Sequence, residues 1–213
     1  MSRIVVFGAA GKAGSRIVSE AAARGHDVVA VARHTESLGD LPPGAVAASG
    51  DSTSPDAIRN LVPGADAVVV AVNGPGNVLW RDAAQALVET ISTLPEPRPR
   101  IIHMGSGATL LLPDGTRPLD SPGFPAQFMD VATGQAAALD YYRSSQGVEW
   151  TYFSPPPLEF GPGERRGHYR TGLDHPVTDA DGRAVLSYED FAVALVDEIE
   201  QGRFLNTRFT AGY

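Results

Sequence analysis

The stretch Ile4-Val5-Val6-Phe7-Gly8-Ala9-Ala10-Gly11-Lys12-Ala13-Gly14 decides the fold, because an apolar run passes through three glycines into a helical segment. Glycine at positions 8 and 11 permits a tight turn and a close approach of backbone N–H groups to a phosphate, while Gly14 lets the helix pack against the strand. The pattern therefore predicts a dinucleotide-binding turn at the start of the first helix, with Ala10, Lys12 and Ala13 completing it. The alternative is a tight turn without a ligand.

The rest of the chain alternates short apolar runs with helical segments, which is typical of a doubly wound α/β sheet. Six central strands, covered on both faces, are expected at Ile4–Phe7, Val28–Ala32, Val46–Ala48, Ala67–Val72, Arg100–His103 and Trp150–Phe153, with a last strand at Arg208–Ala211. Helices are expected at Lys12–Arg24, Asp56–Leu61, Val78–Thr93, Ala126–Ser144 and Tyr188–Gln201. These elements predict one Rossmann-type domain over residues 1–213 with a parallel sheet.

Two segments rich in Gly and Pro, Gly107–Pro125 and Pro155–Arg183, are too long for ordinary connections in such a fold. Each follows a strand end, where ligands of open α/β sheets bind, so we expect them to cover a cofactor. The alternative is surface decoration. Ser187 is expected to cap the last helix, with Asp190 in its first turn.

Composition excludes several classes of site. The 213 residues include no cysteine, which excludes thiol nucleophiles and disulfides and fits a cytoplasmic location. The net charge of -8 argues against a nucleic-acid partner. The apolar runs are strand-sized and no leader peptide is evident, so neither a membrane span nor secretion is expected. The five histidines show no ligand spacing, so no metal site is expected.

The end of the second strand distinguishes the two nicotinamide dinucleotides. NAD-specific proteins place an acidic residue there, against the ribose 2′-hydroxyl, whereas this chain has Arg33 and His34. The Arg33 guanidinium is suited to a 2′-phosphate, so NADP(H) is preferred and NAD(H) is the alternative. Asp27 is at the start of the strand, which is the wrong edge for a ligand. Arg33 can equally be a solvated residue at a strand end.

Two further strand ends are candidate cofactor contacts from topology alone. Gly50 and Asp51 follow the third strand and are expected near the adenine. The turn after the fourth strand is expected near the ribose and the backbone of the cofactor, and it comprises Ala71, Val72, Asn73 and Gly74. Asp51 can instead cap the following helix or start a turn, and Asn-Gly is itself a turn sequence.

Nearly the whole chain resembles the atypical short-chain dehydrogenase/reductases, which include NADH-flavin-reductase-like, biliverdin reductase B-like and NmrA-like proteins. The resemblance is carried by Ile4–Gly14, Ala32-Arg33, Gly50-Asp51, His103–Leu110, Trp150–Pro156 and Leu186–Val193. It implies an NAD(P)H oxidoreductase, monomeric or weakly associated, with a small site above the nicotinamide.

The resemblance also assigns roles at two later strand ends. Met104, Gly105 and Ser106 match the segment beside the nicotinamide, where the serine can hydrogen-bond the carboxamide or an acceptor carbonyl. Ser154, Pro155 and Pro156 match the segment that backs the nicotinamide, chiefly with backbone groups. Both segments also fit ordinary turns and strand exits.

One departure from standard short-chain dehydrogenases bears on the reaction. Those enzymes use Tyr-x-x-x-Lys, whereas Tyr141 here is followed four residues on by Ser145 and Tyr142 by Gln146. Reduction of a carbonyl through a tyrosine acid is disfavoured unless Ser106, His168 or Tyr169 transfers the proton. The basic loop Gly163–Arg170 is either an attractor for an anionic acceptor or a solvated turn.

Three functions remain at this stage. The first is NADPH-dependent hydride transfer to a flavin-like, quinone or other conjugated small molecule, which needs little protein acid–base chemistry. The second is an NADP(H)-sensing regulator of NmrA-like type that acts through a protein partner without turnover. The third, an epimerase or dehydratase, is weaker because those enzymes generally use the missing Tyr and Lys.

Overall fold

The computed structural model describes residues 1–213 and contains one eight-stranded sheet in the order β3-β2-β1-β4-β5-β6-β10-β8. Its strands are β1 (Arg3–Phe7), β2 (Asp27–Ala32), β3 (Ala45–Ser49), β4 (Ala67–Val70), β5 (Arg100–Met104), β6 (Trp150–Ser154), β8 (Arg170–Gly172) and β10 (Thr207–Gly212). Neighbours are parallel except for β8, which runs antiparallel to β10. A small parallel sheet pairs β7 (Glu159–Gly161) with β9 (Val185–Ser187).

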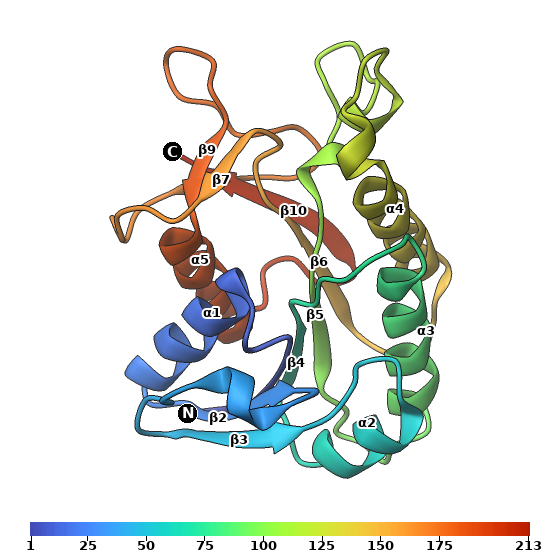
Figure 1. The fold of residues 1–213 in the computed structure, drawn as a ribbon, viewed down its shortest axis with the longest axis vertical. Helices are drawn as coiled ribbons and strands as arrows, with labels where there is room; N and C mark the ends of the chain where they lie inside the picture. Colours follow the sequence, from blue (N-terminus) through green and yellow to red (C-terminus); the bar gives the residue numbers. More distant parts are fainter.

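The helices lie on both faces of the large sheet (Figure 1). Helices α1 (Lys12–Ala23) and α5 (Tyr188–Gln201) pack together on one face, and α2 (Pro55–Leu61), α3 (Leu79–Ile91) and α4 (Met129–Ser144) cover the other. Alternate residues of β1 therefore enter two separate cores, Ile4 with α1 and α5, and Phe7 with α3. The predicted doubly wound Rossmann-type fold is confirmed.

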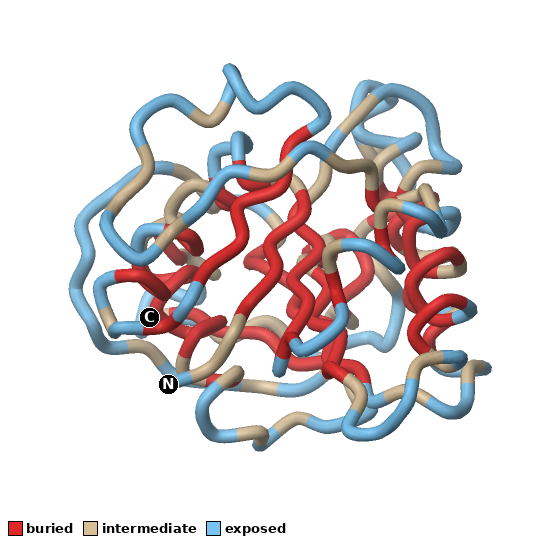
Figure 2. The backbone as a smooth tube through the Cα atoms, turned by 90° about the horizontal axis from the view of Figure 1, so that it is seen from below, coloured by how far each residue is buried: buried red, intermediate tan, exposed pale blue.

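The strands at the centre of the sheet are buried along their length, with exposed loops around them (Figure 2). All seven predicted strands of the large sheet are present. No helix has the length and apolar character needed to cross a membrane.

The prediction that Val46–Ala48 is a central strand is wrong. Strand β3 is the last strand of the sheet on its side, and no residue in it is fully buried. The Val46 side chain is 57% exposed. The apolar run reflects strand propensity, but the run does not specify where in the sheet the strand lies.

The two long segments are more ordered than their composition indicates. Pro155–Arg183 contains β7 and β8, and Gly107–Pro125 contains two short 3-10 turns, Gly107–Thr109 and Pro118–Asp120. A third such turn, Ala126–Phe128, precedes α4, so the regular helix starts three residues later than predicted.

The last helix begins as the sequence predicts. Its cap is Ser187, whose hydroxyl accepts a hydrogen bond from the Asp190 N–H at 3.0 Å. The Asp190 carboxylate is fully buried.

Candidate nucleotide-binding site

The glycine-rich turn joins the carboxyl end of β1 to α1 and is held against β2 and β4. The N–H groups of Gly8 and Ala9 both donate to the Val31 carbonyl at 3.1 Å. Gly8 has φ +82°, and a Cβ there would lie 2.4 Å from the Ala71 oxygen. A Cβ on Gly14 would lie 2.1 Å from the Gly8 oxygen. Neither position can hold a side chain without moving the backbone, so the predicted roles of these glycines in the turn and in helix packing agree with the geometry.

The N-terminus of α1 presents free hydrogen-bond donors. No side chain caps the helix, and its first turn contains no acidic residue. The first backbone hydrogen bond of the helix is donated by Ser15 to Gly11, so the N–H groups of Lys12, Ala13 and Gly14 have no acceptor in the protein. A row of free donors at the positive end of a helix fits a pyrophosphate.

The carboxyl end of β2 carries Arg33, which is exposed and whose guanidinium has no acceptor in the protein. Its carbonyl accepts a hydrogen bond from the Ser49 hydroxyl at 3.1 Å, which ties β2 to the end of β3. The His34 ring lies 3.9 Å from the Glu36 carboxylate. Asp27 lies at the opposite end of β2, as expected, and faces Arg3 at 3.9 Å.

After β3, Asp51 starts a turn and does not cap the following helix. Its carboxylate accepts hydrogen bonds from the Thr53 N–H at 2.9 Å and from the Thr53 hydroxyl at 2.8 Å, which is a turn. Helix α2 is capped instead by Ser54. A Cβ on Gly50 would lie 2.8 Å from the Leu61 side chain, so Gly50 allows α2 to pack closely.

The chain leaves β4 two residues earlier than predicted. The Val72 carbonyl accepts a hydrogen bond from the Trp80 indole at 3.1 Å, which turns the segment toward α3. Asn73 is exposed and Gly74 is partly buried beside the carboxyl edge of the sheet. A Cβ on Gly74 would lie 2.9 Å from the Leu79 side chain.

At the end of β5, Ser106 starts a 3-10 turn. Its hydroxyl oxygen accepts a hydrogen bond from the Ala108 N–H at 3.2 Å, which leaves the hydroxyl proton free to donate. Gly105 lies directly against an aromatic ring, because a Cβ there would be 2.0 Å from Tyr152 Cε1.

At the end of β6, the Ser154 side chain is turned into the core. It is fully buried, and its oxygen lies 3.4 Å from the Thr109 hydroxyl. The whole segment is buried at the carboxyl edge of the sheet, including Pro155 and Pro156. It lies against Gly107, because a Cβ on Gly107 would be 2.6 Å from the Pro155 oxygen. The Ser154 hydroxyl therefore faces the core.

Sequence reasoning missed a buried polar network beneath the Ser106 turn. His103 of β5 is stacked on Tyr152 of β6, with ring centroids 5.2 Å apart, and it hydrogen-bonds Gln135 and Tyr142 of α4. Burial lowers the pKa of His103 to about 3, so the ring is neutral. The only sequence signal is a histidine inside an apolar strand.

The structure places Tyr169 away from the other predicted residues. Its hydroxyl donates to the Asp197 carboxylate of α5, and Asp197 also pairs with Arg24 at the far end of α1. Helix α1 has 12 residues and is about 18 Å long, so this end is remote from the glycine-rich turn. Burial and the Asp197 carboxylate raise the pKa of Tyr169. His168 is exposed, with its ring against the Arg166 carbonyl. We leave both residues out of the candidate site.

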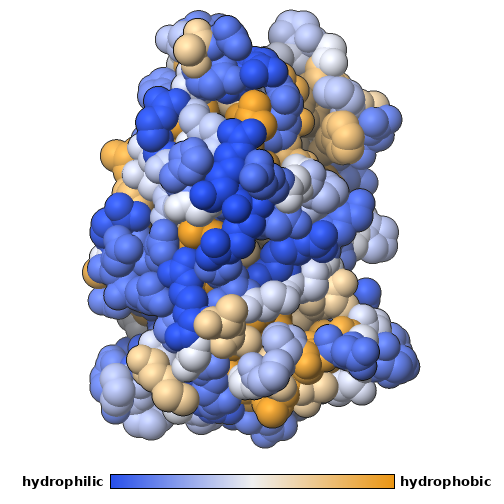
Figure 3. Space-filling model, turned by 90° about the vertical axis from the view of Figure 1, so that its left-hand side faces the viewer, coloured by the Kyte–Doolittle hydropathy of each residue, from blue (hydrophilic) through white to orange (hydrophobic).

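The basic loop is fixed by the protein itself. Arg165 forms two hydrogen bonds to Glu20 of α1, at 2.8 and 2.9 Å, and Arg166 lies over the Tyr213 ring. The buried Asp190 carboxylate accepts the N–H groups of Arg166 and Gly167. The side of the molecule where α1 and α5 lie is accordingly largely hydrophilic (Figure 3). These contacts favour the interpretation of the loop as a turn on the surface over its interpretation as an attractor for an anionic acceptor.

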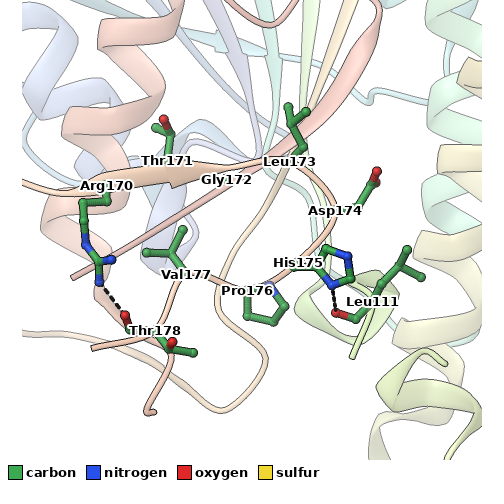
Figure 4. A pocket seen from close by; sticks show the side chains of 10 residues that line it. All are labelled: Leu111, Arg170, Thr171, Gly172, Leu173, Asp174, His175, Pro176, Val177 and Thr178. Atoms are coloured by element: carbon green, nitrogen blue, oxygen red, sulfur yellow. Dashed lines mark hydrogen bonds between the residues drawn. The ribbon is translucent and has the colours of Figure 1, made fainter. Parts of the chain in front are cut away.

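The two long segments are joined to each other. Leu111 donates its N–H to the Asp174 carbonyl at 2.8 Å, and the His175 ring hydrogen-bonds the Leu111 carbonyl at 2.9 Å. The buried Arg208 guanidinium of β10 binds both the Thr109 carbonyl and the Asp174 carboxylate. A cavity of about 670 Å³ lies between Leu111 and Arg170–Thr178 (Figure 4).

All the candidate cofactor residues thus lie at or next to the carboxyl ends of the parallel strands of the large sheet, around a glycine-rich turn. A model of the NAD(P)H-binding family matches residues 8–201. The chain belongs to the NAD(P)H-binding family. The donors and the absent side chains described above fit the dinucleotide for which this family is named.

Members of known sequence or structure align along the whole chain. The protein YwnB of Bacillus subtilis is 30% identical over 212 residues, covering 98% of this chain and 97% of its own. An exported-protein candidate of Burkholderia pseudomallei has 36% identity, a TM-score of 0.88 and full coverage of both chains. A candidate NADH-flavin reductase of Streptococcus pneumoniae has 28% identity and a TM-score of 0.86, covering 100% of this chain and 99% of its own. These similarities confirm the resemblance at the level of the NAD(P)H-binding fold.

Proposed function

We propose that this chain is an NADPH-dependent oxidoreductase that transfers hydride to a flavin, a quinone or another conjugated small molecule. The observation that carries the proposal is the uncapped N-terminus of α1, with three free N–H groups behind a turn that only glycine can form. The NADH-flavin reductase candidate of Streptococcus pneumoniae, similar over the whole chain, supports the choice of acceptor class.

Bound reduced dinucleotide would supply the hydride. The chain's own contribution is binding and orientation. The N–H groups of Lys12, Ala13 and Gly14 would hold the pyrophosphate, and Arg33 would bind the 2′-phosphate. Lys12 is exposed at the first position of the helix and adds positive charge there. Ser106 would donate its free hydroxyl proton to the carboxamide or to an acceptor carbonyl.

The tyrosines of α4 support an acceptor that needs no protein acid. Tyr142 is fully buried, and burial raises its pKa. The Tyr141 hydroxyl lies 3.5 Å from the Glu89 carboxylate, and its pKa is also raised, first by burial and then by that charge. Neither is followed by a lysine that would lower its pKa. A conjugated acceptor spreads the incoming charge and can take its proton from water.

The preference for NADPH rests on Arg33. It stands alone at the strand end where an acidic residue would bind a ribose 2′-hydroxyl, and it has no carboxylate partner. A guanidinium without a partner is suited to a phosphate because its fork of donors matches two phosphate oxygens.

The test is absorbance of NADPH and NADH with the purified protein, alone and with FMN, FAD, riboflavin and a panel of quinones. The proposal expects loss of NADPH absorbance that requires the acceptor and is faster than with NADH. Tight binding of NADPH without turnover on any acceptor would favour the sensing regulator instead. Absence of binding to either dinucleotide would contradict both.

A further inference from the structure

In the buried network beneath Ser106, the neighbours of the Gln135 amide fix its orientation. Gln135 Nε2 lies 3.1 Å from the Met104 carbonyl oxygen. Gln135 Oε1 lies 2.7 Å from the Tyr152 hydroxyl and 3.2 Å from His103 Nε2. The reversed amide would place two oxygens against each other at Met104, so Gln135 Nε2 donates and Oε1 accepts.

The tautomer of His103 follows from that orientation. Since Gln135 Oε1 can only accept, His103 Nε2 must carry the proton of the neutral ring. His103 Nδ1 is then an acceptor, and the Tyr142 hydroxyl, 3.1 Å away, donates to it. The hydrogen bonds at Gln135 Nε2, His103 and Tyr142 thus have a fixed direction, while the Tyr152 hydroxyl has two acceptors, Gln135 Oε1 at 2.7 Å and the Gln135 main-chain carbonyl at 2.8 Å.

Two of the hydrogen bonds of the Gln135 side chain are made to residues next to the turn that carries Ser106. One holds the carbonyl of Met104, the last residue of β5. The other holds the Tyr152 ring, against which Gly105 lies without room for a side chain. Gln135 is the only side chain in the cluster that makes both bonds.

We infer that Gln135 is a positioning residue, which acts through Met104 and Tyr152 to hold the Gly105–Ser106 turn in place for hydride transfer. Its catalytic consequence rests on the proposed function. A shift of the turn by about 1 Å would misplace the Ser106 hydroxyl and lower the rate about 10- to 100-fold while leaving the distant pyrophosphate contacts intact.

The decisive variant is Gln135→Met, which has a similar length but neither the donor to Met104 nor the acceptor for His103 and Tyr152. The inference expects kcat with the best acceptor to fall about 10-fold or more, with the Kd for NADPH within about twofold of wild type. Gln135→Glu should show the same split only at a pH at which its carboxyl is ionised, because a protonated carboxyl would still donate to Met104.

The matched control replaces a buried glutamate by glutamine at another place in the fold. Glu198 of α5 is fully buried and pairs at 2.6 Å with Arg100, the first residue of β5, at the opposite edge of the sheet. Glu198→Gln should lower Tm at least as much as the Gln135 variants, with kcat within about twofold of wild type. A wild-type kcat in Gln135→Met, or equal losses of kcat in Gln135→Met and Glu198→Gln at equal Tm, would overturn the inference.

A second readout does not depend on turnover. Nitrogen NMR of the histidines should show His103 protonated at Nε2 and not at Nδ1 from pH 5 to 8, and NADPH-induced amide shifts at Gly105 and Ser106 should change in Gln135→Met. If wild type turns over no acceptor, the proposed function fails while these signals still test the positioning role. Protonation at Nδ1, or unchanged shifts in the variant, would overturn the inference.

Discussion

Replacement of Arg33 by alanine should lower the affinity for NADPH and leave that for NADH unchanged. Arg33 is exposed and unpaired, so its loss should not alter the fold. A unit charge pair at about 4 Å contributes about 1 kcal/mol in water and about 4 kcal/mol near a protein surface. Because Arg33 is exposed, we expect the lower half of this range, about 1 to 2.5 kcal/mol, which corresponds to an increase of about 5- to 70-fold in the Kd for NADPH.

The assay is a fluorescence titration of both dinucleotides at two salt concentrations. Wild-type affinity for NADPH should fall with salt more steeply than that of Arg33→Ala, because the lost contact is between charges at the surface. The matched control is Arg59→Ala, which removes another exposed arginine, paired with Asp56 on α2, and should change neither Kd. Equal losses of affinity for NADPH and NADH, or no loss for either, would refute the assignment of Arg33.

Three further changes test the site and its support. Gly8→Ala should abolish binding of both dinucleotides and lower Tm, because its Cβ would lie 2.4 Å from the Ala71 carbonyl oxygen. Titration measures the binding and calorimetry the Tm, and retained binding would contradict the role of the turn. The folded-state pKa of about 3 for His103 lies below the unfolded value of about 6.5, so stability is lost as the pH falls below 6.5. Urea unfolding should show a loss of about 2 kcal/mol between pH 7 and pH 5 that His103→Asn lacks, and an equal loss in the variant would show another cause. Arg208→Met should free Thr109 and Asp174 and raise hydrogen exchange in both long segments, whereas unchanged exchange would show that the other contacts suffice.

Local patterns predicted the parts of the fold that depend on neighbouring residues. The glycine spacing at 8, 11 and 14 predicted the turn, and Ser187 predicted the start of α5, because both are settled within a few residues. The exposed position of β3 was missed, since strand order depends on pairing partners. The strands β7 and β9 have three residues each and show no periodicity.

The support of the site depends on partners that are distant in the sequence. Gln135 meets His103 across 32 residues, and Arg165 meets Glu20 across 145 residues. Nothing in either local sequence indicates such a contact. The strand ends could be predicted to lie near a ligand because the carboxyl ends of parallel strands meet at one edge of the sheet. The side chains that pack behind these strand ends could be identified only from the three-dimensional structure.

Arg208 bridges the two long segments, and this bears on how ligands exchange. Because a buried cation of β10 binds Thr109 of one segment and Asp174 of the other, we expect the two segments to stay joined at these residues between turnovers. We therefore expect dissociation of the oxidised dinucleotide or the chemical step, and not a conformational gate, to limit the rate. Substitution of exposed residues on these two segments is then a way to change the preference for an acceptor. Because the segments are joined through Arg208, we expect such substitutions to have little effect on the position of a bound nicotinamide.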